Sequence, residues 1–405
     1  MMSEKKVPAI RFRGFEDDWE QRKLSNITDI VGGGTPSTSN PDYWEGDIDW
    51  YTPAEIGEQI FAYGSVRKIT KEGLIHSSAK ILPAHKTVLF TSRAGIGNMA
   101  ILKRPAATNQ GFQSLVCHDD IDPYFMFSMG DSIKAKAERV AAGSTFAEIS
   151  GKKLGELEFM FPDTDEQKAI GAYFKNLDYL ITLHQRKLEK LKIVKKSMLV
   201  NCFPKNGEKV PKFRFSGFTG DWEQRKVGDI TIESTEYTTL DAGYPLLTSS
   251  RAGLMYQNEY RGNLTTDSKE TLFSVVPIGA CTYRHMSDDD VFHLNINTLE
   301  KGLVSREYPV FFATKENCLN FIIQYINSSA SFRAFCAEQK KGGTRTRLYY
   351  NALCEFKMMV PSKREQEVIA GYLLSLDHLI TLHQKQWFIL KKLQFSPGSN
   401  SPVAA

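Results

Sequence analysis

The chain contains an internal repeat with a period of about 200 residues. Residues 7–28 read VPAIRFRGFEDDWEQRKLSNIT, residues 210–231 read VPKFRFSGFTGDWEQRKVGDIT, and 14 of the 22 positions are identical. Residues 165–194 match residues 364–393 at 14 of 30 positions, and both segments contain LITLHQ. Because solenoid repeats span only roughly 20–50 residues, a period this long indicates a repeated domain with an appended element.

The segments between the matching blocks differ. Residues 32–142 and 235–341 barely match, so we predict one scaffold that is built twice and carries different loops. The length of 405 residues, with 41% hydrophobic and 24% charged residues, is ordinary for a globular protein of two or three domains. The net charge of +4 permits a nucleic-acid partner without arguing strongly for one.

The second matching pair has the periodicity of long helices. Apolar residues recur at spacings of three and four along each segment, and such a stripe is typical of a coiled-coil seam. The predicted seam residues are Ile170, Phe174, Leu177, Ile181, His184, Leu188, Leu191, Ile369, Leu373, Leu376, Ile380, His383, Trp387 and Leu390. Asp163 and Ser362 each follow a proline and precede a glutamate by three residues, which predicts an N-cap with a capping box.

Two helices that are apolar along one side will bury those sides against each other. We expect an antiparallel pair, because the two copies of the unit are then related by a pseudo-twofold axis. The predicted organisation is a globular domain over residues 1–162, a helix over 163–205, a second globular domain over 206–361, a shorter helix over 362–395 and a disordered tail over 396–405.

His184 and His383 occupy equivalent positions of the predicted seam. A metal site or a pH-sensitive site is one interpretation. The favoured interpretation is a polar residue that fixes the register of the helices, because no Cys, Asp or second His completes a ligand set nearby.

Each globular part has a mixed α and β pattern, so the predicted fold class is α+β. Residues 86–100 and 272–284 have the composition of strands around turns. Residues 123–140 and 315–339 are predicted helices, and each ends at a glycine loop.

Two features shared by the copies are candidate nucleic-acid contacts. The glycine loops carry hydroxyl and basic side chains that suit phosphate contact, although basic residues there can also simply oppose a helix dipole. A Thr-x-Arg sequence occurs in both copies; arginine can read guanine, and asparagine or glutamine can read adenine, but all of these residues are also common in turns. The candidates are Arg93, Asn98, Asn109, Gln110, Ser144, Thr145, Ser250, Arg251, Tyr283, Arg284, Lys340, Lys341, Thr344, Arg345 and Arg347.

Common catalytic and metal-binding motifs do not occur in the sequence. There is no GxxxxGK[ST], GxSxG or HExxH, and the six cysteines form no CxxC, so we expect no cofactor, no metal and a reducing, cytoplasmic location. No apolar stretch approaches the roughly 20 residues of a membrane span, and the N-terminus lacks the core of a signal peptide, so no membrane association is expected. These observations favour a binding protein.

Three sequence blocks carry a family resemblance. They are the DWEQRK-type openings at residues 18–24 and 221–227, the segment GGTPSTSNPDYWEGDIDW at residues 33–50, and the two EQ-initiated helices with LITLHQ. With these blocks the chain resembles the specificity (S) subunit of type I restriction-modification enzymes. The resemblance implies two target-recognition domains that each read half of a split double-stranded DNA sequence, and helices that form a spacer.

The same resemblance implies protein partners. Two modification subunits would bind S-adenosylmethionine and methylate adenine, and two restriction subunits would use ATP and Mg. The chain itself would then be a non-catalytic subunit that reads an asymmetric, bipartite target. Two other hypotheses remain: a protein–protein adaptor with two globular arms, and a stand-alone DNA-modifying enzyme with unfamiliar motifs.

Overall fold

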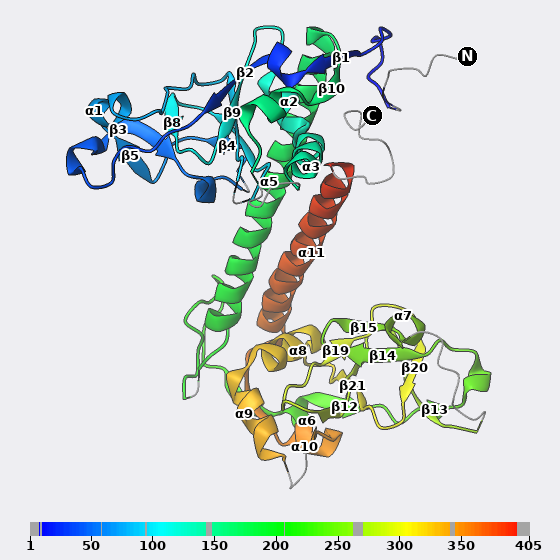
Figure 1. Ribbon diagram of the computed structural model, residues 1–405. Helices are drawn as coiled ribbons and strands as arrows, with labels where there is room; N and C mark the ends of the chain where they lie inside the picture. Colours follow the sequence, from blue (N-terminus) through cyan, green and yellow to red (C-terminus); the bar gives the residue numbers. More distant parts are fainter. Residues whose placement is uncertain are drawn as a thin grey trace, which may run out of the picture. The chain divides into compact units, whose positions relative to one another are not determined.

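The structure is a computed structural model that describes residues 8, 10–57, 59–93, 95–142, 148–205, 207–261, 270–340 and 345–394. The chain divides into two compact units, Met1–His184 with Gln386–Ala405, and Gln185–Lys385. Each unit contains one globular domain and a segment of each long helix (Figure 1). Each long helix is therefore divided between the two compact units.

A five-stranded sheet forms the centre of the first unit. Its strands run in the order β2 (Thr28–Gly32), β9 (Gln113–Cys117), β6 (Thr87–Phe90), β7 (Met99–Leu102) and β4 (Phe61–Ala62). Val88 and Phe90 of β6 share a core with helices α2 (Pro123–Ser128) and α3 (Gly130–Ala141), whereas Leu89 belongs to a separate core with Tyr51. Successive side chains of a strand point to opposite faces, so both faces of this sheet are buried.

A smaller sheet extends the first unit. It joins β5 (Arg67–Ile69), β3 (Trp44–Tyr51) and β8 (Ala106–Thr108), beside the short helix α1 (Lys71–Ile75). A bulge in β3 places both Trp44 and Ile48 opposite Ile69. Glu45 lies in this bulge at a φ of 60°, and a Cβ on Gly46 would come within 2.5 Å of the Ile69 carbonyl oxygen. The bulge therefore depends on a glycine.

The second unit repeats this plan with shorter strands. One sheet has the order β12 (Thr231–Glu233), β21 (Val310–Ala313), β17 (Cys281–Thr282) and β19 (Asn295–Ile296), and another has the order β13 (Tyr237–Thr238), β16 (Phe273–Val276) and β20 (Gly302–Ser305). The two-stranded pairs are β14 (Leu247–Ser250) with β15 (Gly253–Tyr256), and β18 (Met286–Ser287) with β22 (Thr346–Arg347). Helices α8 (Leu319–Ser328) and α9 (Ala330–Glu338) supply Phe321 and Phe332 to a core that contains Phe311 of β21. The remaining helices of both domains are short: α4 (Gly151–Gly155), α6 (Val227–Ile230), α7 (Gln257–Arg261) and α10 (Tyr350–Cys354).

Each unit ties its two repeated sequence blocks together. β1 (Glu20–Lys23) pairs with β10 (Glu158–Phe161), and β11 (Glu223–Lys226) pairs with β23 (Lys357–Val360), both antiparallel. Arg11 donates two hydrogen bonds to the buried carboxylate of Glu166, at 2.8 and 2.7 Å, and Arg214 does the same with Glu365, at 2.7 and 2.8 Å. We call these two pairs the arginine clasps. They explain why the two blocks recur together, since each block holds the other.

The hydrogen bonds at the helix starts agree only in part with the prediction. The Asp163 carboxylate accepts hydrogen bonds from the backbone N–H groups of Asp165 and Glu166, at 2.8 and 2.9 Å, so this N-cap is confirmed. The capping box is wrong, because the carboxylates of Glu166 and Glu365 accept from the clasp arginines instead. A bidentate arginine is a stronger partner for a buried carboxylate than one backbone N–H.

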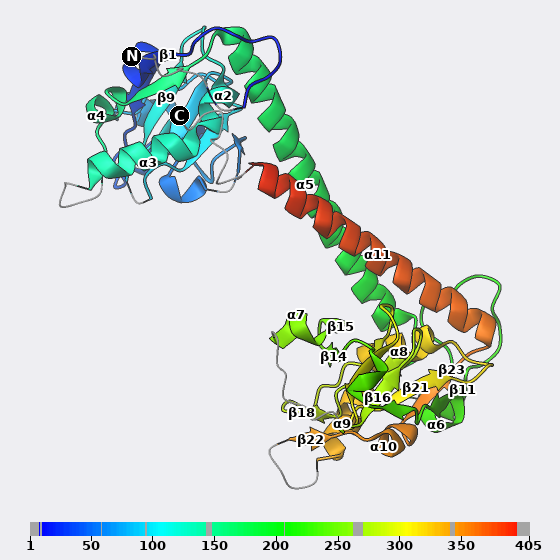
Figure 2. The same cartoon turned by 90° about the vertical axis from the view of Figure 1, so that its right-hand side faces the viewer.

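Helices α5 (Thr164–Asn201) and α11 (Lys363–Gln394) are the two predicted long helices, and they pack together in antiparallel directions. In the first unit, Gln394 at the end of α11 donates to Asp178 in the first half of α5. In the second unit, Lys195 near the end of α5 pairs with Asp377 in the first half of α11. Figure 2 shows the start of α11 near β11 and β23 within the second unit.

The predicted seam residues are buried to different degrees, and those in the first turns pack into the domains instead. Ile170, Leu177, Ile181, Leu188, Ile369, Leu373 and Leu376 are buried, and Phe174, His184, Leu191, Ile380, His383, Trp387 and Leu390 are half-buried. Ile170 and Phe174 pack into the core of the first globular domain, and Ile369 and Leu373 into the core of the second. The first turns of each helix therefore anchor it to its own domain. No helix within the described ranges combines the length and apolar character needed to cross a membrane.

Candidate nucleic-acid interface

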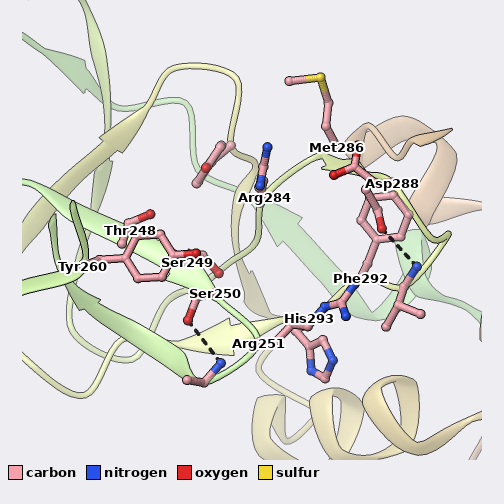
Figure 3. Close-up of a pocket in the computed structure, with 14 residues that line it drawn as sticks. Thr248, Ser249, Ser250, Arg251, Tyr260, Arg284, Met286, Asp288, Phe292 and His293 are labelled. Carbon is pink, nitrogen blue, oxygen red and sulfur yellow. Dashed lines mark hydrogen bonds between the residues drawn. The ribbon is translucent and has the colours of Figure 1, made fainter. Parts of the chain in front are cut away.

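A cavity of about 410 Å³ opens in the second unit. Hairpin β14–β15, the segment after β17 and the loop after β18 supply its walls. Figure 3 shows Thr248 and Tyr260 on one side and Met286 and Phe292 on the other, with Arg284 between them. The lining mixes hydroxyl, aromatic and basic side chains, which is the mixture expected where a protein contacts DNA bases and phosphates.

Two arginines at this cavity are held by a run of aspartates. Arg251 pairs with Asp289, and Nε of Arg345 donates to Oδ1 of Asp288 at 2.7 Å. The hydrogen bond from Arg251 is the main reason that the pKa of Asp289 lies below its usual range. Both arginine side chains are more than half exposed, at 62% and 54%. Because exposed ion pairs contribute little, a phosphate or a base can replace the aspartates at small cost.

Two further arginines approach the cavity without such partners. Arg284 and Arg347 are exposed, and the ion pairs found among the described residues include neither of them. Both lie near the buried His285, whose pKa is lowered first by burial and then by these two guanidinium groups. β18 pairs with β22 so that Met286 lies opposite Arg347. Four arginines from three separate segments thus converge on one face of the second domain.

The structure brings together many of the predicted contacts of this domain. Ser250, Arg251 and Arg284 line the cavity, Arg345 bonds to its lining residue Asp288, and Arg347 lies opposite its lining residue Met286. Tyr283 is fully buried against the rings of Phe292 and Phe311, so its prediction as a DNA contact was wrong. The neighbouring Arg284, in the same segment after β17, is exposed.

Three predicted contacts of the second domain are not among these residues. Lys340 is exposed just beyond the end of α9 and does not line the cavity. Lys341 and Thr344 fall outside the described residues.

Four of the predicted contacts of the first domain lie on neighbouring loops. Arg93 and Asn98 belong to the β6–β7 hairpin, and Asn109 and Gln110 follow β8. The backbone N–H of Ser92 donates to the carbonyl of Gly111 at 2.8 Å, which joins the two loops. Ser144 and Thr145 fall outside the described residues.

The amide side chains of these loops are engaged within the protein. Nδ2 of Asn98 donates to the carbonyl of Ile56 at 3.1 Å, and Oδ1 of Asn109 accepts from the backbone N–H of Gly111 at 2.8 Å. Bidentate reading of adenine requires both ends of one amide group. The structure therefore favours the turn-shaping alternative for both asparagines. Gln110 accepts from the Thr35 hydroxyl in the same way.

One exposed basic residue of the first domain was not among the predicted contacts. Arg67 of β5 lies with its guanidinium carbon 3.7 Å from the ring centroid of Trp44 and 5.8 Å from that of Trp50. The two tryptophans belong to the segment over residues 33–50 that carries the family resemblance, but no local signal places a distant arginine on them. Arg93 is half-exposed, and Arg67 is exposed.

The described residues offer no obvious reactive centre. They contain no group of three or more His, Cys, Asp or Glu side chains arranged for a metal ion. All six cysteines are free thiols. Burial raises the pKa of Cys117 to about 12 and that of Cys202 to about 11, so these two thiols are protonated at neutral pH and are poor nucleophiles.

Comparison with known proteins gives consistent matches. A family model described as "Type I restriction modification DNA specificity domain" matches residues 16–193 and 294–387, more than half of the chain. The "Type I restriction enzyme MjaIX specificity subunit" of Methanocaldococcus jannaschii is 34% identical over 224 residues, which cover 53% of this chain and 51% of that protein. The chain thus spans about half the length of this relative.

Two other comparisons extend over the whole chain. The "Putative type I restriction enzyme MjaX specificity subunit" of Methanocaldococcus jannaschii is 25% identical over 407 residues, covering 91% of this chain and 89% of that protein. The crystal structure of the type I restriction-modification system S subunit from M. genitalium superposes with a TM-score of 0.57 at 13% identity, over 96% of this chain and 97% of that one, which supports the same fold. The chain belongs to the family defined by the type I restriction modification DNA specificity domain.

Proposed function

We propose that this chain is the DNA-recognition subunit of a type I restriction-modification system and reads an asymmetric, bipartite DNA sequence. The observation that carries the proposal is one scaffold, closed by the same arginine clasp, built twice with different exposed loops. Two unlike reading surfaces on one frame suit two unlike half-sites. The chain performs no chemistry of its own in this proposal.

In this proposal the repeated domains and the repeated helices have different roles. Residues 1–162 and 206–361 each read one half-site, and the helical segments 163–205 and 362–395 set the separation between the halves. For two modules that read the same face of B-DNA, that separation is on the order of one helical turn, 34–36 Å. The predicted tail over 396–405 lies outside the described residues.

Repeated exposed apolar residues on the long helices support two equivalent protein partners. Tyr173 and Tyr372 are 41% and 37% exposed, and Leu180 and Leu379 are both 39% exposed. Each pair occupies matching positions of the repeat. We propose that two modification subunits dock here, bind S-adenosylmethionine and methylate adenine, and that two restriction subunits, which use ATP and Mg, complete the assembly in the cytoplasm.

Methylome sequencing tests this proposal directly. A host that lacks other methyltransferases would express the chain with its modification subunit, and we expect one split motif to become methylated at adenine. Replacing residues 235–341 with the corresponding segment of another family member should change one half of the motif and leave the other half intact. A change in both halves, or methylation without a split motif, would contradict independent reading.

Salt dependence separates DNA recognition from the adaptor hypothesis. Phosphate contacts release counterions, so the DNA affinity of the assembled complex should fall steeply between 50 and 200 mM salt, by about 10³-fold or more for six or more contacts. Affinity that does not change with salt would favour the adaptor. Methylation of DNA by the purified chain alone would favour the enzyme.

A further inference from the structure

Two tryptophans of the first domain form a rigid pair. Trp44 and Trp50 are 8% and 3% exposed, and their rings meet edge to face with centroids 5.1 Å apart. Nε1 of Trp44 donates to the carbonyl of Ser37 at 3.1 Å, and Nε1 of Trp50 donates to the carbonyl of Gly34 at 2.8 Å. Both indoles are therefore fixed to the loop over residues 34–37.

Arg67 lies over this pair. It is opposite Trp50 in the β3–β5 register, and its guanidinium carbon is 3.7 Å from the Trp44 centroid. A guanidinium stacked on an indole is stabilised by the cation–π interaction and loses much of its rotational freedom. The strained bulge at Glu45 lies between the two tryptophans in β3, and such strain concentrates at functional sites.

The environment of Arg67 points toward an external partner. The adjacent Lys68 pairs with Asp49 at 3.6 Å, whereas Arg67 belongs to none of the ion pairs found in the described part of the chain. Its neighbours along the chain protrude, since Val66 is 86% exposed and Tyr63 is 63% exposed. An exposed arginine without a carboxylate keeps all of its outward N–H groups available.

The loop beside the tryptophans presents polar groups. The hydroxyls of Ser37 and Ser39 lie 2.8 Å apart, and the Thr35 hydroxyl donates to Gln110. Hydroxyl groups of this kind contact DNA phosphates, which fixes the position of a domain without reading sequence. Arg67 is the group in this set with the planar, two-donor geometry that matches O6 and N7 of guanine.

We propose that Arg67, held on Trp44 and Trp50, is a guanine-binding site that reads one base of the half-site recognised by the first domain. The indoles orient the guanidinium before DNA binds, so little side-chain entropy is lost on contact. The proposal rests on the function proposed above, and it assigns a specificity-determining role to a residue that otherwise resembles a structural cap over two aromatic rings.

The experiment uses the full chain assembled with its modification subunit. Wild type should methylate a split motif with a guanine in the half-site read by the first domain. Arg67→Ala should relax the preference for that guanine by about 10- to 100-fold, measured as relative methylation of substrates with each base there, and should leave the second half-site unchanged. Arg67→Lys should give an intermediate preference, because lysine keeps the charge but not the fork of donors. Arg13→Ala removes an exposed arginine of the same domain and should change neither half.

Other outcomes overturn the proposal. Equal loss of affinity for all sequences, with the salt slope reduced by about one and the base preference intact, would make Arg67 a phosphate contact. A lower melting temperature with unchanged base preference in both Arg67→Ala and Arg67→Lys would make it a structural cap. A wild-type motif without guanine in that half would also refute it, whereas absence of any split motif would instead refute the proposed function.

Discussion

The two units anchor their long helices in the same way but support their exposed arginines differently. Each anchors its helix with an arginine clasp to a buried glutamate. In the first unit Arg67 makes cation–π contacts with two tryptophans. In the second unit Arg251 and Arg345 form ion pairs with Asp289 and Asp288. The clasp comes from the matching sequence blocks and the arginine supports from the segments that do not match. The scaffold is thus held together in the same way in both units, whereas different side chains hold the exposed guanidinium groups of each.

The scaffolds also differ in small ways at matching positions. Nε1 of Trp19 donates to Glu166 at 3.2 Å, but Nε1 of the matching Trp222 is buried and has no hydrogen-bond partner among the described residues. Asp178 is 8% exposed and accepts from the Tyr124 hydroxyl, whereas the matching Asp377 is more exposed. These differences allow the contribution of each contact to be measured by comparing one unit with the other.

Loss of a clasp arginine should have the largest effect. Arg11→Ala leaves the Glu166 carboxylate buried without its cation, and Arg214→Ala does the same to Glu365. An uncompensated buried charge costs about 3–5 kcal/mol, so each variant should lower the free energy of unfolding by that amount in urea denaturation. Arg13→Ala is the control, because Arg13 is exposed, and it should change stability by less than about 0.5 kcal/mol. A loss below about 1 kcal/mol in both clasp variants would mean that the clasp does not hold the helix.

Substitutions at two matching positions, a glycine in α5 and an alanine in α11, should have the next largest effect on stability. A Cβ on Gly171 would meet Oδ1 of Asp122 at 2.5 Å, and that carboxylate is held by the backbone N–H groups of Tyr124 and Phe125. Gly171→Ala should therefore destabilise the protein by about 1–3 kcal/mol, despite the better helix propensity of alanine.

The matching position of α11 is Ala370, which is buried. Ala370→Gly should cost about 1 kcal/mol through helix propensity alone. Both variants are measured by thermal and urea unfolding. If Gly171→Ala increased stability, the Asp122 carboxylate would be able to move away from the added methyl group. The helix start would then accept an alanine in both units.

Comparison of Trp19 with the matching Trp222 isolates the contribution of one hydrogen bond to stability. Trp19→Phe removes a donor to a buried carboxylate, which is worth about 1.5–3 kcal/mol, in addition to the loss of ring volume. Trp222→Phe loses the same volume but removes a buried donor that has no partner. We expect Trp19→Phe to be more destabilising than Trp222→Phe by about 1–2 kcal/mol. Equal losses would show that the indole N–H of Trp19 adds nothing to the clasp.

Much of the scaffold could be predicted from the sequence. The repeat and the helical periodicity gave the two long helices and their antiparallel pairing, because apolar spacing determines which face of a helix is buried. The clasps could not be predicted, since Arg11 and Glu166 are 155 positions apart and the glutamate carries a capping-box pattern that explains it locally. The packing of the first seam residues could not be predicted for the same reason: periodicity shows that Ile170 is buried but not against which partner.

The candidate interface was harder to predict. Thr-x-Arg indicated Arg284, which is exposed at the cavity, and its contact with DNA stays a prediction. The same pattern included Tyr283, which is buried in the core. The aspartates that hold Arg251 and Arg345, and the tryptophans under Arg67, lie on other strands and loops, so only tertiary structure brings them together.

The matched aspartates of the long helices should give the smallest effect, and it should depend on pH. Burial raises the pKa of Asp178 above its usual 3.8, although hydrogen bonds from Tyr124 and Gln394 oppose the shift. A carboxyl with a raised pKa in the folded state stabilises the protein most at low pH, and that contribution is lost as pH rises through the folded-state pKa. Asp178→Asn removes the buried charge, so relative to wild type the variant should gain stability between pH 4 and pH 8. Asp377→Asn loses only a partly exposed pair with Lys195 and should cost about 0.2–1 kcal/mol at pH 8. Melting temperatures at the two pH values provide the measurement, and a loss in Asp178→Asn that is equal at both would mean that its hydrogen bonds outweigh the cost of burying its charge.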